Sequence, residues 1–65
     1  MKLKTLLKKI NNTTLIGLGK KEKTYFILAY KDKVLKAFPD YLDKKINSIS
    51  LEKVDIYNSY LNVVI

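Results

Sequence analysis

The stretch YFILAY, residues 25–30, decides the fold, because all six of its side chains are apolar or aromatic. Successive side chains of a β-strand lie on opposite faces of a sheet, so both faces of this strand carry hydrophobic groups. A half-exposed strand would instead alternate apolar and polar residues. The sequence therefore predicts that the strand Thr24–Tyr30 is covered on both of its faces.

The segments that flank this stretch favour two further strands. Thr13–Leu18 is rich in β-branched residues, and Gly19–Lys23 supplies a polar turn into the strand that follows. On the other side, Lys31-Asp32 favours a tight connection to a third strand, Lys33–Phe38. This part of the chain is predicted to be a three-stranded antiparallel meander.

The N-terminal segment predicts an amphipathic helix. Leu3, Leu6, Leu7 and Ile10 follow the spacing i, i+3, i+4, i+7, which places them on one stripe, and lysines occupy the remaining face. We expect the stripe to pack on the core of the protein, because four apolar residues make a thin membrane anchor. The helix is expected to end at Asn11.

The C-terminal half predicts a short helix and a hairpin. Pro39-Asp40 ends the meander, and Asp40 is placed to cap a helix from Tyr41 to Ile46. Ser48–Ile65 is strand-like, with a bulge or turn expected at Glu52-Lys53 and a two-residue hairpin turn at Asn58-Ser59. The predicted fold class is α+β, a single domain of residues 1–65 with an N-terminal helix, a three-stranded antiparallel meander, a short helix and a C-terminal β-hairpin.

The small size of the chain predicts self-association. A chain of 65 residues without Cys or His has neither a disulfide nor a zinc site to support its small core. We expect a homodimer built on one face of the apolar strand, either Tyr25, Ile27 and Ala29 or Phe26, Leu28 and Tyr30. The final strand, Tyr60–Ile65, is a second candidate, as an exposed edge.

Composition also predicts the compartment and argues against catalysis. The absence of Cys favours the cytoplasm, and no apolar run is long enough for a signal peptide or a membrane span. His and Cys carry most acid–base and nucleophilic chemistry, and neither occurs. Asp40 and Asp43 are better explained by helix capping, and Gly17-Leu18-Gly19 lacks the spacing of a phosphate loop. We therefore expect no catalytic residue, no cofactor and no metal.

The net charge of +7 predicts an acidic partner, and all 13 basic residues are lysines. Either AT-rich coding bias or selection for binding explains this charge. Without Arg there is no bidentate guanidinium contact to guanine or phosphate, so sequence-specific DNA recognition is disfavoured. Lys20, Lys21 and Lys23 beside Tyr25 and Tyr30 are best explained as a solvated turn next to core aromatics, and sequence-tolerant contact with nucleic acid is the alternative. For Tyr57 and Tyr60, which flank a hairpin end, the alternative to core packing is an anchor patch for a protein partner. The candidate partner-binding residues are Lys20, Lys21, Lys23, Tyr30, Tyr57 and Tyr60.

Two stretches give the chain a resemblance to known sequences. They are KLKTLLKKINNTTLI, residues 2–16, and FPDYLDKKINSIS, residues 38–50, followed by a hydrophobic C-terminal strand. On these stretches the chain resembles small uncharacterised proteins of Firmicutes phages and prophages. The resemblance implies a host-takeover or anti-defence factor that inhibits a host protein stoichiometrically, and it supplies no site residue. The alternative function is a lysine-rich nucleic-acid-binding module with little sequence specificity.

Overall fold

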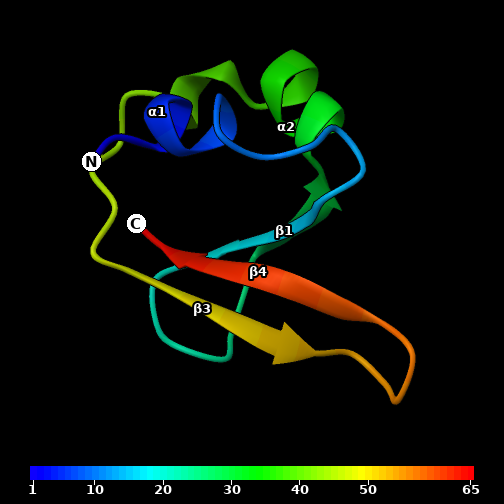
Figure 1. Ribbon diagram of the computed structural model, residues 1–65. Coiled ribbons are helices and arrows are strands. Elements are labelled where there is room, and N and C mark those ends of the chain that lie inside the picture. The colour runs from blue at the N-terminus through cyan, green and yellow to red at the C-terminus, as the bar shows by residue number, and fades with distance from the viewer.

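The protein is an α+β fold in which helices cover one face of a four-stranded sheet, as a computed structural model of residues 1–65 describes it (Figure 1). The predicted α+β class is thus confirmed. In chain order the elements are α1 (Leu3–Leu7), β1 (Leu15–Gly19), β2 (Ile27–Tyr30), α2 (Lys31–Ala37), the 3-10 helix η1 (Pro39–Tyr41), β3 (Ser48–Lys53) and β4 (Ser59–Val64).

The sheet is mixed, and its strand order is β2-β1-β4-β3. β1 pairs antiparallel with β2 and parallel with β4, and β3 and β4 form an antiparallel hairpin. The predicted three-stranded antiparallel meander is therefore wrong. β4 lies inside the sheet, so Tyr60–Ile65 is not an exposed edge, whereas β2 lies at an edge.

The predicted third strand, Lys33–Phe38, is helical and belongs to α2. Val34 is fully buried, and Phe38, four residues later, donates its N–H to the Val34 carbonyl at 3.0 Å. Asp32 lies in the first turn and Lys36 in the last, where each charge suits the helix dipole. A short apolar run is compatible with a strand and with a helix, and the burial of Val34 in the same core cluster as the leucines of α1 favours the helix.

The helix predicted from Tyr41 to Ile46 is also wrong. Pro39 opens the single 3-10 turn η1 instead, and Asp40 lies within that turn without capping it. After η1, Leu42 and Asp43 form a turn, and Lys45 then pairs with Lys2 in an isolated bridge. The N–H groups of Leu3 and Lys4 bond to the carbonyls of Lys44 and Leu42 at 3.0 and 2.9 Å. Leu42 and Ile46 still pack against the core, as their apolar character predicts.

The C-terminal hairpin is confirmed, but its turn lies elsewhere. Cα pairing runs without a bulge from Ser48 opposite Val64 to Lys53 opposite Ser59. The connection consists of residues 54–58, which explains why Val54 and Ile56 break the alternation of the preceding strand. The predicted bulge at Glu52-Lys53 is therefore absent, and β4 begins at Ser59.

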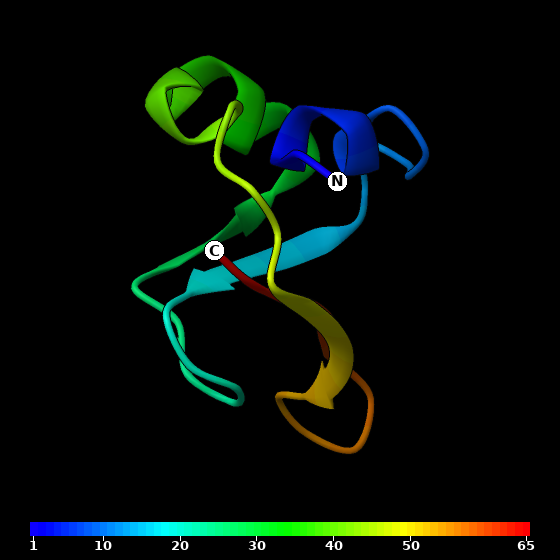
Figure 2. The same cartoon turned by 90° about the vertical axis from the view of Figure 1, so that its left-hand side faces the viewer.

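The hydrophobic core lies between the helices and one face of the sheet. α1 is confirmed as a helix, although it ends at Leu7, and its apolar stripe is buried against Ile16, Leu18 and Val63. Ile27 and Ala29 of β2 pack against the same core. Figure 2 shows that the β1–β2 connection and the β3–β4 turn reach away from the helices, on the far side of the sheet.

Candidate binding surface

The β1–β2 connection, residues 20–26, folds back over the face of the sheet that carries no helix, which we call the open face. Its anchor is Asn62 of β4, whose side chain is completely buried. The Asn62 Oδ1 accepts the backbone N–H of Lys23 at 3.2 Å, and its Nδ2 donates to the Thr24 carbonyl at 3.0 Å. These two bonds hold the connection against the middle of the sheet. A buried amide with partners for both of its polar atoms incurs little desolvation cost.

Two glycines of β1 make room for this arrangement. A Cβ at Gly17 would lie 2.7 Å from the Tyr60 ring, and a Cβ at Gly19 would collide with the backbone carbonyl of Thr24. Both glycines are buried. Gly17-Leu18-Gly19 is therefore neither a phosphate loop nor a flexible hairpin end. Because neither glycine has a side chain, the β1–β2 connection and the Tyr60 ring can lie close to the backbone of β1.

Tyr60 is the buried aromatic residue of the open face. Its ring packs edge-on against Tyr25, with ring centroids 5.3 Å apart. Burial raises the pKa of the Tyr60 phenol, and the nearby charge of Glu52 adds to the effect. The phenol is therefore neutral throughout the physiological range, and Tyr60 supports the surface without offering its own ring to a partner.

An open hollow of about 710 Å³ lies at the end of the sheet where β1 and β4 begin. Leu28, Tyr30 and Tyr60 line it on the side of the open face, and Leu51 and Val54 line it on the side of the hairpin. Leu51 is 72% exposed and Tyr30 54%. The hollow thus joins the apolar surface of β2 to that of the β3–β4 hairpin.

The turn of that hairpin presents the two most exposed large hydrophobic side chains of the protein. Ile56 is 82% exposed and Tyr57 is 88% exposed. The carboxylate of Asp55 holds the turn, because its Oδ1 accepts the backbone N–H groups of Tyr57 and Asn58, both at 2.8 Å. The Asn58 Nδ2 also donates to both carboxylate oxygens at 3.1 Å. We call Ile56 and Tyr57 the hairpin tip.

These hydrogen bonds hold the pKa of Asp55 below its ordinary value. The side-chain bond from Asn58 has the largest effect, followed by the backbone bonds from Tyr57 and Asn58. The ionised carboxylate is therefore part of the turn at neutral pH. The hairpin tip is displayed on an ordered turn, so less conformational entropy of the turn would be lost when a partner binds.

The six residues singled out in the sequence do not form one cluster. The Lys20, Lys21 and Lys23 side chains are exposed on the β1–β2 connection, and Tyr30 lies at the end of β2 beside the hollow. Tyr57 is at the hairpin tip, whereas Tyr60 is buried. The structure brings Tyr30 and Tyr60 to one hollow, and Tyr57 is the most exposed aromatic side chain of the protein.

Three residues of this surface were not predicted as site residues. Asn62, a lone polar residue inside the apolar run of residues 60–65, is the kind of residue that buries only with hydrogen-bond partners. Asp55 and Asn58 have the spacing of a side-chain-stabilised turn, and this spacing identifies Ile56 and Tyr57 as turn residues.

The helices are too short and too polar to span a bilayer. No three acidic side chains converge into a group that could hold a metal ion. No protein-family model matches the chain, and neither a curated protein nor a solved structure is similar to it in the corresponding searches.

Proposed function

We propose that this chain is a non-catalytic binding protein that docks its hairpin tip onto another protein. The observation that carries the proposal is the display of Ile56 and Tyr57, 82% and 88% exposed, on a turn held by the Asp55 carboxylate. Exposed apolar side chains on a pre-ordered support are typical of anchor residues at protein interfaces. Leu51 and Val54, both exposed, extend this apolar surface toward the body of the hairpin.

The carboxylates support a binding role in preference to a catalytic one. Asp55 is engaged by the amides of its own turn, and Asp43 is paired with Lys4 at 3.0 Å. The hydrogen bond from Lys4, the largest cause, and the charges of Lys4 and Lys2 lower the pKa of Asp43. Neither carboxylate has the raised pKa of a general acid near neutral pH. We propose a stoichiometric inhibitor or modulator of a host protein as the specific form of this function, which is what a resemblance to phage proteins would imply.

The test is affinity capture from nuclease-treated lysate of the host cell, followed by titration with the purified captured protein. The tip variant, Ile56→Ser with Tyr57→Ser, is compared with a matched variant, Leu35→Ser on α2, whose side chain is exposed on the helical side of the sheet away from the hairpin tip. Binding at a fixed stoichiometry by the wild-type protein and the matched variant, with loss by the tip variant, is expected. Equal binding by both variants would overturn the proposal, as would loss of capture on nuclease treatment.

We also infer that the free edge of β3 pairs with β3 of a second copy. Ile65 donates its N–H to Gly19 of β1, so alternation along β4 points Asn62 and Val64 toward β3. The backbone groups of Ile49 and Leu51 then point outward, and their side chains are 42% and 72% exposed. Antiparallel pairing about Ser50 places Ile49 of one copy against Leu51 of the other. Such an apolar edge invites strand addition.

A further inference from the structure

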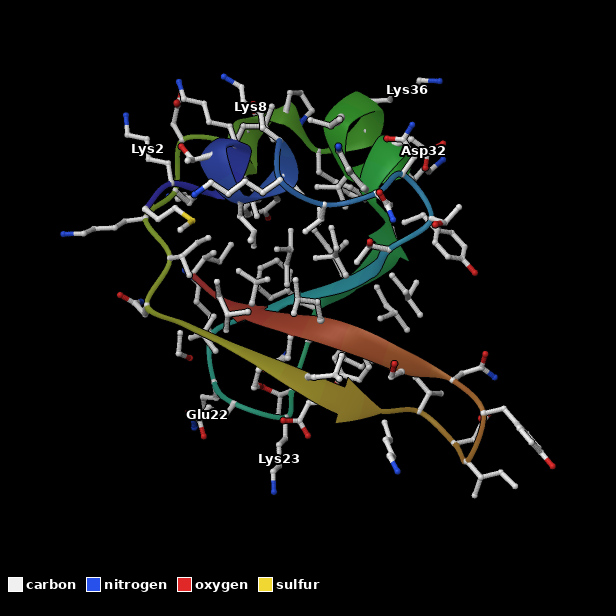
Figure 3. The ribbon with its side chains drawn as sticks, in the orientation of Figure 1. Lys2, Lys8, Glu22, Lys23, Asp32 and Lys36 are labelled. Atoms are coloured by element: carbon white, nitrogen blue, oxygen red, sulfur yellow. The ribbon has the colours of Figure 1, made fainter.

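The lysines are gathered on one side of the protein. Residues 1–12 and 31–47, which contain the helices, hold nine of the 13 lysines and only three of the six acidic residues. We call these two segments the helical layer. Residues 48–65 hold one lysine, Lys53, and two carboxylates. Figure 3 shows Lys2, Lys8 and Lys36 pointing away from the sheet on the helical side. A coding bias raises lysine content but does not by itself concentrate lysine in one layer.

Three lysines of the helical layer are engaged within the protein. Lys4 and Lys2 contact the Asp43 carboxylate at 3.0 and 4.0 Å, and the Lys31 Nζ donates to the Ile10 carbonyl at 2.8 Å. The other six make no ion pair and no side-chain hydrogen bond, and all six are exposed. They are Lys8, Lys9, Lys33, Lys36, Lys44 and Lys45. Asp32, beside Lys33, directs its carboxylate to the Lys33 backbone N–H at 2.9 Å.

We propose that this layer binds the phosphate backbone of double-stranded nucleic acid. The six free ammonium groups of the helical layer complement a regular array of phosphates, and lysine contributes there as a point charge. The layer has no exposed aromatic side chain, so it lacks the stacking platform that favours single strands. Binding is therefore independent of base sequence, because phosphate contacts carry no sequence information.

An anionic membrane is the less fitting partner for this layer. Its only large apolar side chains that are substantially exposed are Met1 at 54% and Leu35 at 39%. Stable membrane association needs an apolar face that inserts among the acyl chains in addition to basic charge. The helical layer lies apart from the hairpin tip, so this binding does not depend on the proposed protein partner.

The test measures binding of a fluorescent 16-base-pair duplex of mixed sequence by anisotropy, at several salt concentrations between 50 and 200 mM. The helical-layer variant, Lys8→Gln, Lys9→Gln and Lys36→Gln, is compared with a variant of equal net charge, Lys20→Gln, Lys21→Gln and Lys53→Gln. All six positions are exposed. Circular dichroism confirms that each variant retains its fold.

The wild-type protein is expected to bind the duplex with a steep salt dependence. The helical-layer variant should lose at least about tenfold in affinity at low salt, and its slope of log K against log salt should fall in magnitude by about 2 to 3, because each lost phosphate contact contributes about 0.9. The equal-charge variant should stay within about threefold of wild type. Equal losses in both variants, no binding of the duplex by the wild-type protein, or preference for phosphatidylglycerol vesicles over the duplex would each overturn the proposal.

Discussion

The Oδ1 atom of Asn62, in the middle of β4, accepts the backbone N–H of Lys23 at 3.2 Å, across 39 residues of chain. Lys23 has a φ of 62°, so it holds a left-handed conformation, and this bond satisfies its N–H. The adjacent carbonyl, that of Thr24, accepts from the Asn62 Nδ2. One buried amide thus ties the middle of the β1–β2 connection to the sheet.

Replacing Asn62 with Leu should destabilise the protein and release the connection. The change leaves the Lys23 N–H and the Thr24 carbonyl without their partners, which costs roughly 1–3 kcal/mol. Urea denaturation measures the free energy of unfolding, and tryptic cleavage after Lys20, Lys21 and Lys23 reports release of the β1–β2 connection. Asn12→Leu, at an exposed position, is the control and should change neither measurement. A connection that remains resistant to trypsin in the Asn62 variant would contradict the anchoring role.

Gly19→Ala should cost more stability than Gly17→Ala. The new Cβ at position 19 meets the backbone of Thr24, whereas at position 17 it meets the side chain of Tyr60 at 2.7 Å. A side chain moves more cheaply than backbone, and overpacking typically costs about 1–3 kcal/mol. In a double-mutant cycle measured by thermal unfolding, Tyr60→Val should reduce the cost of Gly17→Ala and leave that of Gly19→Ala unchanged. Equal relief at both positions would show that Tyr60 is not the neighbour that excludes a side chain at Gly17.

The hairpin turn should loosen in acid. The pKa of Asp55 is lowered in the folded protein from its ordinary value of 3.8, so its contribution is complete above that value and is lost as pH falls through the lower, folded pKa. Proton NMR shifts of the Tyr57 and Asn58 amides should therefore titrate with a midpoint below 3.8. Asp55→Asn, which keeps an acceptor oxygen, should abolish this titration. A midpoint at or above the ordinary value would contradict the hydrogen-bonded turn.

The proposed dimer should dissociate when Leu51 is replaced with Lys. The added charge would lie beside the paired edge of β3, where Leu51 is 72% exposed in the single copy. Because each copy carries a net charge of +7, added salt should strengthen association by screening repulsion. Sedimentation equilibrium across a dilution series measures both effects, with Leu35→Lys on the helical layer as the control. A monomer at all micromolar concentrations, or dissociation by the control alone, would exclude pairing through β3.

The sequence alone determined the fold class, the α1 stripe, β1 and the hairpin, because each depends on a local period. Leu3, Leu6 and Leu7 repeat at helical spacing and are buried, and Ile49 and Leu51 alternate with serines in β3. The composition of the chain also favoured a binding role over catalysis, and that role stays a proposal. Among the predicted site residues, Tyr57 was found at the exposed tip, and Tyr60 was not accessible.

Tertiary structure alone decided the rest, because it depends on contacts between residues far apart in the chain. The parallel pairing of β1 with β4 moves the C-terminal strand to the middle of the sheet and β2 to an edge. α2 is a helix because the burial of Val34 in the core outweighs the strand propensity of a short apolar run. Asn62 is an anchor only once the β1–β2 connection lies over it, and the lysines form a layer only once residues 1–12 and 31–47 share one side of the sheet. Periodicity is a property of neighbouring residues, whereas strand order and a charged layer arise from how distant segments pack.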